Sequence, residues 1–381
     1  MKYKLKDIFD LQMGKTPSRS NSTYWGTKDH KWISIADLSK TGKYISDTKE
    51  YLSEAAIEES GIRVIPANTV VMSFKLSIGK TAITAENMYS NEAIMAFHDR
   101  HVVEILPEYV FYMFKYRNWD KGSNKAVLGK TLNKATLSEI EIDICSIDKQ
   151  KEIVKILDEV MVILAKRESE LSLLNELIKA RFVEMFGDPV SNSRGLPENT
   201  LPEMGEFGRG VSKHRPRNDP KLLGGKHPLI QTGDVAAADL YITEYDSTYS
   251  DLGLSQSKMW KKGTLCITIA ANIAKTAILD FDACFPDSVV GFIANEKTNN
   301  VYIHYWFSFF QRILEAQAPE SAQKNINLKI LSELKIVCPD KDEQDAFAAF
   351  VAQVNKSKAA VQAALDKTQL LFDSLMQKYF G

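Results

Sequence analysis

Apolar residues recur at every third or fourth position over one long stretch, from about Gln150 to Gly187. A spacing of about 3.5 residues predicts a long helix whose single apolar seam packs against a second helix. Neither Gly nor Pro interrupts the stretch, and Gly187-Asp188-Pro189 predicts where the helix ends. At about 1.5 Å per residue it spans on the order of 50 Å, more than a compact domain needs. The seam positions are Ile153, Leu157, Val160, Leu164, Arg167, Leu171, Leu174, Ile178, Arg181 and Met185.

The last part of the chain repeats this pattern. Gln150 and Gln344 open the two stretches, which end in matching Met185-Phe186-Gly187 and Tyr379-Phe380-Gly381. We expect the two helices to be partners, antiparallel if a pseudo-twofold axis relates the two halves of the chain, with Arg167 facing Val361. The second seam consists of Phe347, Val351, Val354, Lys358, Val361, Leu365, Thr368, Phe372, Leu375 and Tyr379. The residues expected at the helix-pair interface are Leu157, Leu164, Leu171, Leu174, Val354, Val361, Leu365 and Phe372.

The duplication extends through the segments that precede each helix. Residues 33–38 (ISIADL) match 230–235 (IQTGDV), and 78–83 (IGKTAI) match 273–278 (IAKTAI). A repeat of this length is a domain duplication and not a solenoid. Short β-branched runs predict strands near 32–36, 69–74, 78–84 and 139–144. Aromatic-rich stretches predict one further helix per copy, near 107–117 and 301–315, with the aromatic residues in the core.

The fold class that follows is α+β, with two homologous domains separated by two long antiparallel coiled-coil helices. A chain of 381 residues is too long for a single core, and two domains fit the usual domain size. The predicted segments are a first domain at 1–147, a central long helix at 148–187, a second domain at 188–339 that opens with a linker, and a C-terminal long helix at 340–381.

Composition places the chain among ordinary proteins of a reducing cytoplasm. It has no apolar run of membrane-spanning length, its first residues do not predict a signal peptide, and its four cysteines form no CxxC pair. The formal net charge of −1 bears on function, because a protein that grips nucleic acid alone is usually clearly basic. Either the chain does not bind nucleic acid, or its basic residues are local and a partner supplies the rest.

The sequence contains no complete motif for catalysis or for cofactor binding. Three Gly-Lys-Thr stretches, at Gly14, Gly79 and Gly129, lack the earlier glycine that a phosphate-binding loop requires. His98 and His101 have no third ligand and fit a surface pair better than a metal site. The 207–210 stretch (FGRG) is interpreted as a turn. The sequence therefore predicts a non-catalytic chain without a metal or a cofactor of its own.

Basic and polar loops remain, at matching places in both copies. Their Gly and Pro residues predict exposed turns, and their hydroxyls and cations suit phosphates or base edges. A solvated charged loop would have the same composition, so these residues alone leave both interpretations open. The candidate DNA-binding residues are Lys15, Thr16, Ser18, Arg19, Lys28 and Lys31 in the first loop, Lys213, His214, Arg215, Arg217 and Lys226 in its counterpart, and Lys121, Lys125 and Lys130 in a third zone.

Several of these features together resemble one family. The stretches 14–19 (GKTPSR), 24–26 (YWG), 32–38 (WISIADL) and 137–140 (LSEI), followed by Gln150 before a long helix, resemble the target recognition domain of type I restriction-modification specificity subunits. The resemblance covers the whole chain, including the duplication and both helices. The second copy departs from it at 210–215 (GVSKHR), as is expected if the two domains read different sequences.

The resemblance implies a DNA-binding subunit without catalytic activity. It would recognise a bipartite asymmetric DNA target and position two DNA adenine methyltransferase subunits, and through them the restriction and motor subunits. S-adenosylmethionine, ATP and magnesium would then belong to those partners. The alternative is a coiled-coil adaptor whose globular ends bind protein.

A spacing prediction follows if the helices set the distance between the two half-sites. One heptad adds about 10.5 Å of helix, which corresponds to about three base pairs of B-DNA. One heptad inserted after both Leu164 and Val361 should therefore lengthen the unread spacer by about two to three base pairs and leave both half-sites unchanged. Methylated-site mapping checks this result. A folded, methylating variant that keeps the original spacer would show that the helices do not set the distance.

Overall fold

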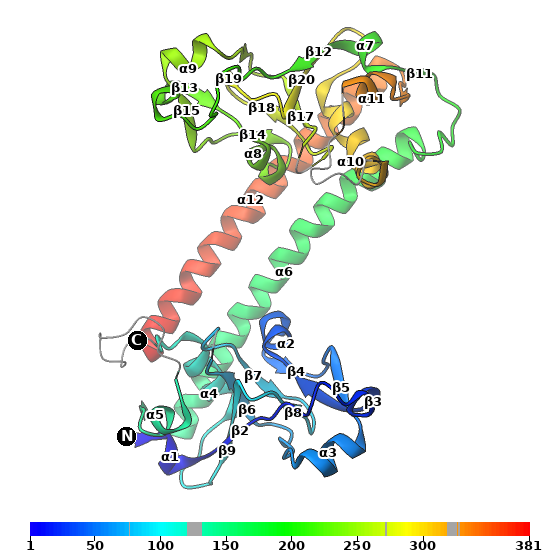
Figure 1. Ribbon diagram of the computed structural model, residues 1–381. Helices are drawn as coiled ribbons and strands as arrows, with labels where there is room; N and C mark the ends of the chain where they lie inside the picture. The colour runs from blue at the N-terminus through cyan, green and yellow to red at the C-terminus, as the bar shows by residue number, and fades with distance from the viewer. Residues whose placement is uncertain (76, 120–131, 271–272, 318–325, 327) are drawn as a thin grey trace. The chain divides into compact units, whose positions relative to one another are not determined.

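The computed structural model describes residues 1–75, 77–119, 132–270, 273–317, 326 and 328–381. It divides into a first unit, Met1–Glu168 with Ala363–Gly381, and a second unit, Ser169–Gln362. Both boundaries fall within the long helices α6 (Ile147–Phe186) and α12 (Lys341–Phe380), of 40 residues each (Figure 1). Each unit therefore contains one globular domain and half of each long helix. Among the described residues, no helix is long and apolar enough to span a membrane.

The first domain is built on a five-stranded sheet in the order β2-β9-β6-β7-β4, with a three-stranded sheet, β5-β3-β8, beside it. In the larger sheet every pair is antiparallel except β4 with β7. The short strands β1 and β10 form a separate antiparallel pair. The strands are β1 Lys2–Lys4, β2 Phe9–Met13, β3 Trp25–Ile33, β4 Tyr44–Ile45, β5 Glu50–Leu52, β6 Val70–Ser73, β7 Thr81–Thr84, β8 Tyr89–Ser90, β9 Ile94–Asp99 and β10 Glu141–Asp143. The helices are α1 Leu5–Ile8, α2 Ile35–Lys40, α3 Glu54–Ser60, α4 Pro107–Tyr116 and α5 Lys134–Ser138.

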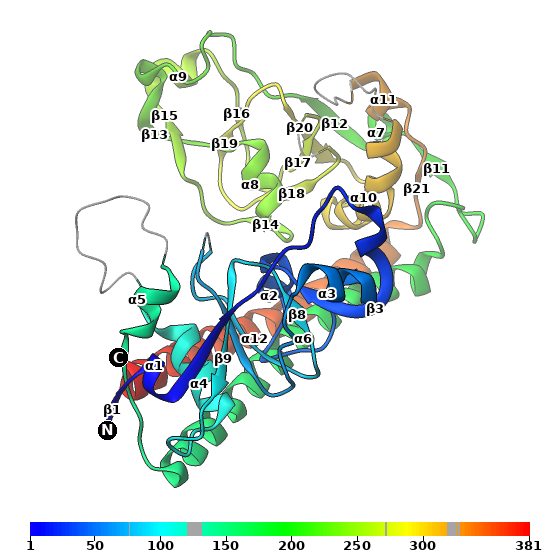
Figure 2. The same cartoon turned by 60° about the horizontal axis from the view of Figure 1, so that its bottom comes forward.

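The second domain repeats this arrangement, with one additional strand, β16, in its smaller sheet. Its five-stranded sheet has the order β12-β20-β17-β18-β14, again with one parallel pair, β14 with β18. The smaller sheet, β15-β13-β19-β16, lies away from α10 and α11 within this domain (Figures 1 and 2). The strands are β11 Glu198–Asn199, β12 Gly205–Arg209, β13 Leu223–Leu229, β14 Tyr241–Ile242, β15 Ser247–Tyr249, β16 Met259–Trp260, β17 Leu265–Thr268, β18 Thr276–Leu279, β19 Ala283–Cys284, β20 Val289–Ala294 and β21 Ile336–Val337. The helices are α7 Leu201–Met204, α8 Thr232–Ala237, α9 Asp251–Ser255, α10 Asn300–Gln317 and α11 Leu328–Glu333. The predicted duplication and α+β class are confirmed.

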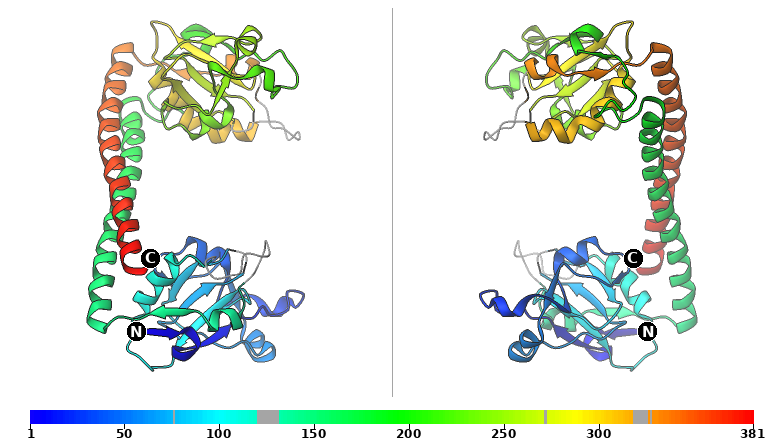
Figure 3. Two further views of the ribbon diagram at one scale, coloured as in Figure 1. Left: turned by 90° about the vertical axis from the view of Figure 1, so that its left-hand side faces the viewer. Right: turned by 90° about the vertical axis from the view of Figure 1, so that its right-hand side faces the viewer.

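Within each unit the halves of α6 and α12 lie side by side and share the core of the adjoining domain (Figure 3). In the second unit Phe182 and Phe186 contact Phe347, with ring centroids 5.3 and 5.7 Å apart, while Asn175 accepts a hydrogen bond of 2.6 Å from Lys358. Residue numbers thus rise along α6 as they fall along α12, so the helices run antiparallel. In the first unit Ile153, Leu157, Val160, Leu164, Phe372 and Met376 pack with the aromatic residues of α4.

Two details of the seam differ from the sequence-based expectation. Arg167, which was expected to face Val361, donates within the first unit from its Nη1 to Ala364 O and Thr368 Oγ1, because a guanidinium inside a helix pair must find acceptors. Near the end of α6 the most buried side chains are Phe182 and Phe186, and not Arg181 and Met185. A straight helix of 3.6 residues per turn drifts from a 3.5-residue repeat, so the buried stripe moves by one position.

A buried glutamine ties the start of each long helix to its own domain. Gln150 Nε2 donates to Glu104 O and Cys145 O, both at 3.0 Å, and its Oε1 accepts from Leu106 N at 2.9 Å. Gln344 Nε2 donates to Lys297 O at 3.0 Å and to Pro339 O at 2.8 Å, and its Oε1 accepts from Thr298 Oγ1 at 2.7 Å. Neither glutamine is exposed. Since an unpaired buried amide is costly, these bonds specify how each helix leaves its domain.

Ion pairs add a second tie, with opposite polarity in the two units. In the first unit the domain supplies Lys43 and α6 supplies Asp158, with Nζ–Oδ distances of 2.7 and 2.8 Å. In the second unit the domain supplies Asp239 and α12 supplies Lys358. Partly exposed pairs of this kind contribute little stability by themselves, so their main effect is on which surfaces fit together.

Two local interpretations of the sequence were wrong. The strand predicted at 32–36 ends at Ile33, because Ser34 and Asp37 form a capping box that starts α2, with Ser34 N donating to Asp37 Oδ2 at 2.8 Å. The stretch 207–210, interpreted as a turn, lies mostly in strand β12. The predicted linker also contains β11 and the start of α7.

The helix seam yields a stability prediction. Leu157 is fully buried, so Leu157→Asp removes packing and buries a charge, and should destabilise the first unit by roughly 3–5 kcal/mol or more. Leu173 lies on the same helix but is 60% exposed, so Leu173→Asp should change stability by less than about 0.5 kcal/mol. Thermal and denaturant unfolding measure both variants. Equal loss in the two would contradict the observed seam.

Candidate nucleic-acid interface

Each basic loop begins at a glycine that packs against a turn of its own domain, and the two turns occupy equivalent positions in the two domains. In the first domain Gly14 N donates to Ile94 O at 3.1 Å and Lys15 N to Ser90 O at 2.8 Å. In the second domain Gly210 N donates to Val289 O at 2.8 Å, and the next residue, Val211, to Phe285 O at 3.1 Å. The two loops therefore start at equivalent positions.

The glycines are required by close backbone approach. A Cβ atom on Gly14 would lie 2.2 Å from Asn91 O, and one on Gly210 would lie 2.2 Å from Phe285 O. No side chain fits at such distances. The glycine of the 14–16 stretch (GKT) thus has a packing role.

Arg19 is the most constrained cation of the first loop. Its guanidinium lies 3.8 Å from the ring centroid of Trp25 and 5.0 Å from that of Trp32. It also pairs with Glu50 through both Nη atoms, with an Nη2–Oε2 distance of 3.0 Å. This pairing holds the pKa of Glu50 below its usual value. Half of the Arg19 side chain remains exposed, so a fixed planar cation faces the solvent.

The remaining first-loop candidates differ in their contacts. Lys15 donates to Ser60 O, and Thr16 Oγ1 donates to Glu92. The Ser18 hydroxyl lies 2.8 Å from that of Ser20. Lys31 donates to Ser46 O at 2.6 Å and pairs with Glu86, whereas Lys28 is exposed. The structure therefore fixes some of these side chains and leaves others at the surface.

In the second loop, Asp287 brings two arginines together. Arg217 pairs with Asp287 Oδ1, and Arg215 Nη2 lies 3.4 Å from Asp287 Oδ2. Arg215 Nη1 also donates to His214 O at 2.9 Å. His214 itself pairs with Asp219 at 3.1 Å, and Lys213 is exposed. Lys226 contacts Asp251 instead, at 3.7 Å.

The third zone is described only at its edges. Lys121, Lys125 and Lys130 lie outside the described residues. At the near edge, Lys115 lies 5.2 Å from the Phe111 ring centroid and Arg117 lies 5.6 Å from that of Trp119. Burial lowers the pKa of both cations.

Three carboxylates that the sequence analysis did not single out contact residues of the candidate loops. Glu50, Glu92 and Asp287 each bind a residue of a candidate loop. The missed signal lay in the duplication itself, because aligning the two copies past residue 83 places Glu92 opposite Asp287.

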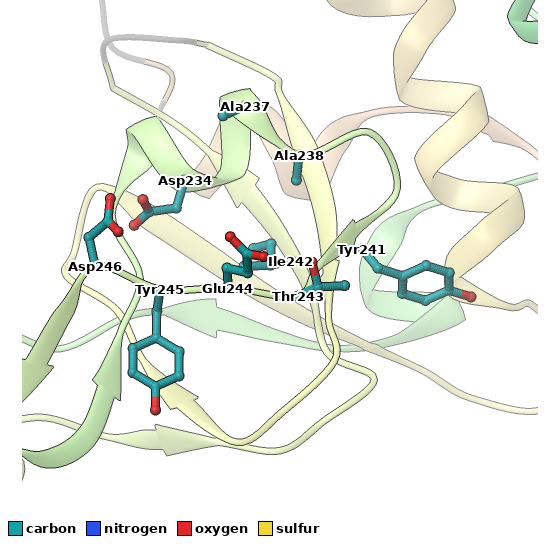
Figure 4. A pocket seen from close by; sticks show the side chains of 9 residues that line it. All are labelled: Asp234, Ala237, Ala238, Tyr241, Ile242, Thr243, Glu244, Tyr245 and Asp246. Carbon is teal, nitrogen blue, oxygen red and sulfur yellow. The ribbon is translucent and has the colours of Figure 1, made fainter. Parts of the chain in front are cut away.

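A separate hollow in the second domain is acidic. It has a volume of about 250 Å³ and is lined by Asp234, Tyr241, Glu244, Tyr245 and Asp246, among others, from α8 through the loop after β14 (Figure 4). Asp234 also accepts a hydrogen bond of 2.7 Å from Gln231 N, which caps α8. Clustered carboxylates repel phosphates, so this hollow does not extend the basic surface.

Metal binding has little support in the part of the chain that the structure describes. No group of three or more His, Cys, Asp or Glu side chains could hold a metal ion there. His98 is half-buried, and burial lowers its pKa, while His101 is exposed at the surface. The four cysteines are free, and Cys266 and Cys284 are buried in the second domain.

Comparisons with known proteins point to one family. The family model for the type I restriction modification DNA specificity domain matches residues 1–173 and 198–367. The type I restriction enzyme MjaIX specificity subunit of Methanocaldococcus jannaschii is 27% identical over 192 residues, which cover 49% of this chain and 43% of that subunit. A second relative from the same organism carries the name of a type I restriction enzyme MjaX specificity subunit. It is 22% identical over 368 residues, which cover 90% of this chain and 84% of that relative.

Solved structures share the fold. The specificity subunit of a type I restriction-modification system from M. genitalium aligns over 100% of this chain and 96% of its own, with a TM-score of 0.58 and 13% identity. A chain from a study of complex assembly in the type I system aligns with a TM-score of 0.64 and 17% identity, over 100% of this chain and 97% of its own. Both domains match a DNA specificity model, which favours DNA recognition over a coiled-coil adaptor whose globular ends bind protein. The chain therefore belongs to the type I restriction-modification DNA specificity family, with one copy of the family domain in each half.

Proposed function

We propose that this chain recognises a bipartite, asymmetric DNA target for a type I restriction-modification complex, with each domain reading one half-site. The observation that carries the proposal is the pair of equivalent loops at Gly14 and Gly210. They share one backbone attachment but present different side chains. The same backbone attachment with different side chains suits the recognition of two different half-sites.

The loop chemistry supports direct readout. A guanidinium can donate two hydrogen bonds to guanine O6 and N7, or bind phosphate oxygens. Arg19, Arg215 and Arg217 are each about half exposed, and each is held by a carboxylate. An arginine fixed in this way loses little conformational entropy on binding, which favours geometric discrimination between bases.

The net charge of −1 supports a shared grip on DNA. Affinity for a duplex comes largely from phosphate neutralisation, which this chain supplies only locally. In the proposal, two DNA adenine methyltransferase subunits bind the chain and make further phosphate contacts, and restriction and motor subunits join through them. S-adenosylmethionine, ATP and magnesium act in those partners, in the cytoplasm, and this chain contributes recognition.

The direct test is to map methylated adenines in the genome of the source cell and to select binding sites from a random duplex library with the reconstituted methyltransferase complex. The expected result is one bipartite motif, with two unlike halves and an unread spacer, in both experiments. Methylation that persists unchanged after deletion of the chain would contradict the proposal.

Arg215→Ala gives a residue-level prediction. If Arg215 contacts a base edge, the substitution should weaken binding to the full target by roughly 1–3 kcal/mol and relax only one half-site. If Arg215 contacts phosphate, binding should weaken alike on all sequences. Competition binding with the methyltransferase subunit present distinguishes these results.

Lys262→Ala provides the matched control, since Lys262 is an exposed cation of the same domain and pairs with Asp280 at 2.7 Å. It should leave affinity and selectivity unchanged. If Arg215→Ala behaves like this control, the second loop does not contact DNA.

A further inference from the structure

We infer that Glu92 and Asp287 are equivalent positioning residues, each of which orients the DNA-facing side chains of its own domain's loop and thereby sets the selectivity of one half-site. The inference rests on the proposed function, because it assumes that these loops read DNA. Both residues lie outside the basic loops. In this inference they do not contact DNA themselves but act through the loop side chains that they hold.

The backbone establishes the equivalence of the two carboxylates. Ile94 N donates to Asn91 O at 3.2 Å, and Val289 N donates to Pro286 O at 3.0 Å, so each carboxylate is the second residue of the same turn. On the far side of that turn, Ala93 O accepts from Phe74 N at 2.9 Å, and its counterpart Ser288 O accepts from Ile269 N at 3.0 Å.

The loop glycines cross these same turns. Gly14 approaches Asn91 O, and Gly210 approaches Phe285 O and Pro286 O, closely enough to exclude a Cβ atom. Each carboxylate is thereby placed beside the start of its loop. The two copies have diverged in the loop itself, yet both retain an acidic residue at this position of the turn.

In the first domain Glu92 acts on the loop through a hydroxyl and through charge. It accepts a hydrogen bond from Thr16 Oγ1. This bond is the main reason that the pKa of Glu92 lies below its usual value, and the charges of Lys75 and Arg19 lower it further. Glu92 is therefore ionised near neutral pH, at the place where a loop with several cations needs a fixed counter-charge.

In the second domain Asp287 acts directly on two guanidinium groups. It accepts from Nη2 of Arg217 and lies 3.4 Å from Nη2 of Arg215. Arg215 is also held by the carbonyls of Ser212 and His214. With three acceptors around it, the Arg215 side chain presents a fixed set of donors to a base pair.

Two opposing electrostatic effects follow for DNA binding. The carboxylate repels phosphates, so it lowers affinity for DNA of any sequence. It also restrains cations that would otherwise find phosphates, so it raises discrimination between sequences. A residue with only a structural role would instead lower both properties when it is replaced.

The test uses the full chain in complex with its methyltransferase subunit and a random duplex library. Glu92→Gln should relax one half of the selected motif and Asp287→Asn the other half, each with about a tenfold loss of selectivity against a scrambled half-site. Affinity for scrambled DNA should rise, with a steeper dependence on salt. The two variants serve as controls for each other, and Asp246→Asn in the acidic hollow controls for the change in net charge.

Three results would overturn the inference: unchanged selectivity in both variants, relaxation of the same half by both, or a clean switch to another base. A switch would make the carboxylate itself the base-reading group. If the amide variants unfold, the variants Glu92→Asp and Asp287→Glu test the inference instead. They keep the charge and should keep low affinity for scrambled DNA, and a rise in that affinity would overturn the inference.

Partner variants and the wild-type complex complete the design. Arg217→Gln should relax the same half-site as Asp287→Asn, and the double variant should lose little more than either single one. Additive losses of selectivity in the double variant would contradict a coupling between Arg217 and Asp287. If the wild-type complex enriches no bipartite motif, the proposed function fails, whereas an enriched motif that the variants leave intact defeats only this inference.

Discussion

The structure depends on the burial of each long-helix half in the aromatic core of a domain. In the second unit Phe182 and Phe186 pack with Phe347 and with Tyr302 of α10, and all four side chains are almost fully buried. A helix pair of this length with a narrow apolar seam is modestly stable by itself. Packing against a domain adds apolar area on a second side, so domain and helices stabilise one another.

Much of this arrangement could be predicted because it is periodic or repeated. The helices follow from the spacing of Leu157, Leu164 and Ile178, and the duplication follows from matched strands. The contacts of Arg167 and the burial of Phe182 could not be predicted, because they depend on the exact helical phase. Ser34 was likewise predicted to lie in a strand, because the sequence pattern does not show that its side chain caps α2.

The candidate interface was less predictable than the fold. Residue type marks Arg19 and Arg215 as possible DNA contacts, but the carboxylate that each of them pairs with is set by the fold. Those pairings come from chain segments far apart in sequence, where no local pattern connects donor and acceptor. They also place acidic side chains beside arginines of both loops, in a chain whose formal net charge is −1.

The attachment of the two loops has an evolutionary consequence. Gly14 and Gly210 are held by main-chain hydrogen bonds, and their partners in these bonds are also main-chain atoms. Loop side chains beyond these glycines can therefore change without loss of the bonds that anchor the loop. Under the proposed function, a lineage could acquire a new recognition sequence through a few substitutions in one loop, while the domain core and the other half-site stay as they were. The fold thus separates the residues that selection must preserve from those that it is free to vary.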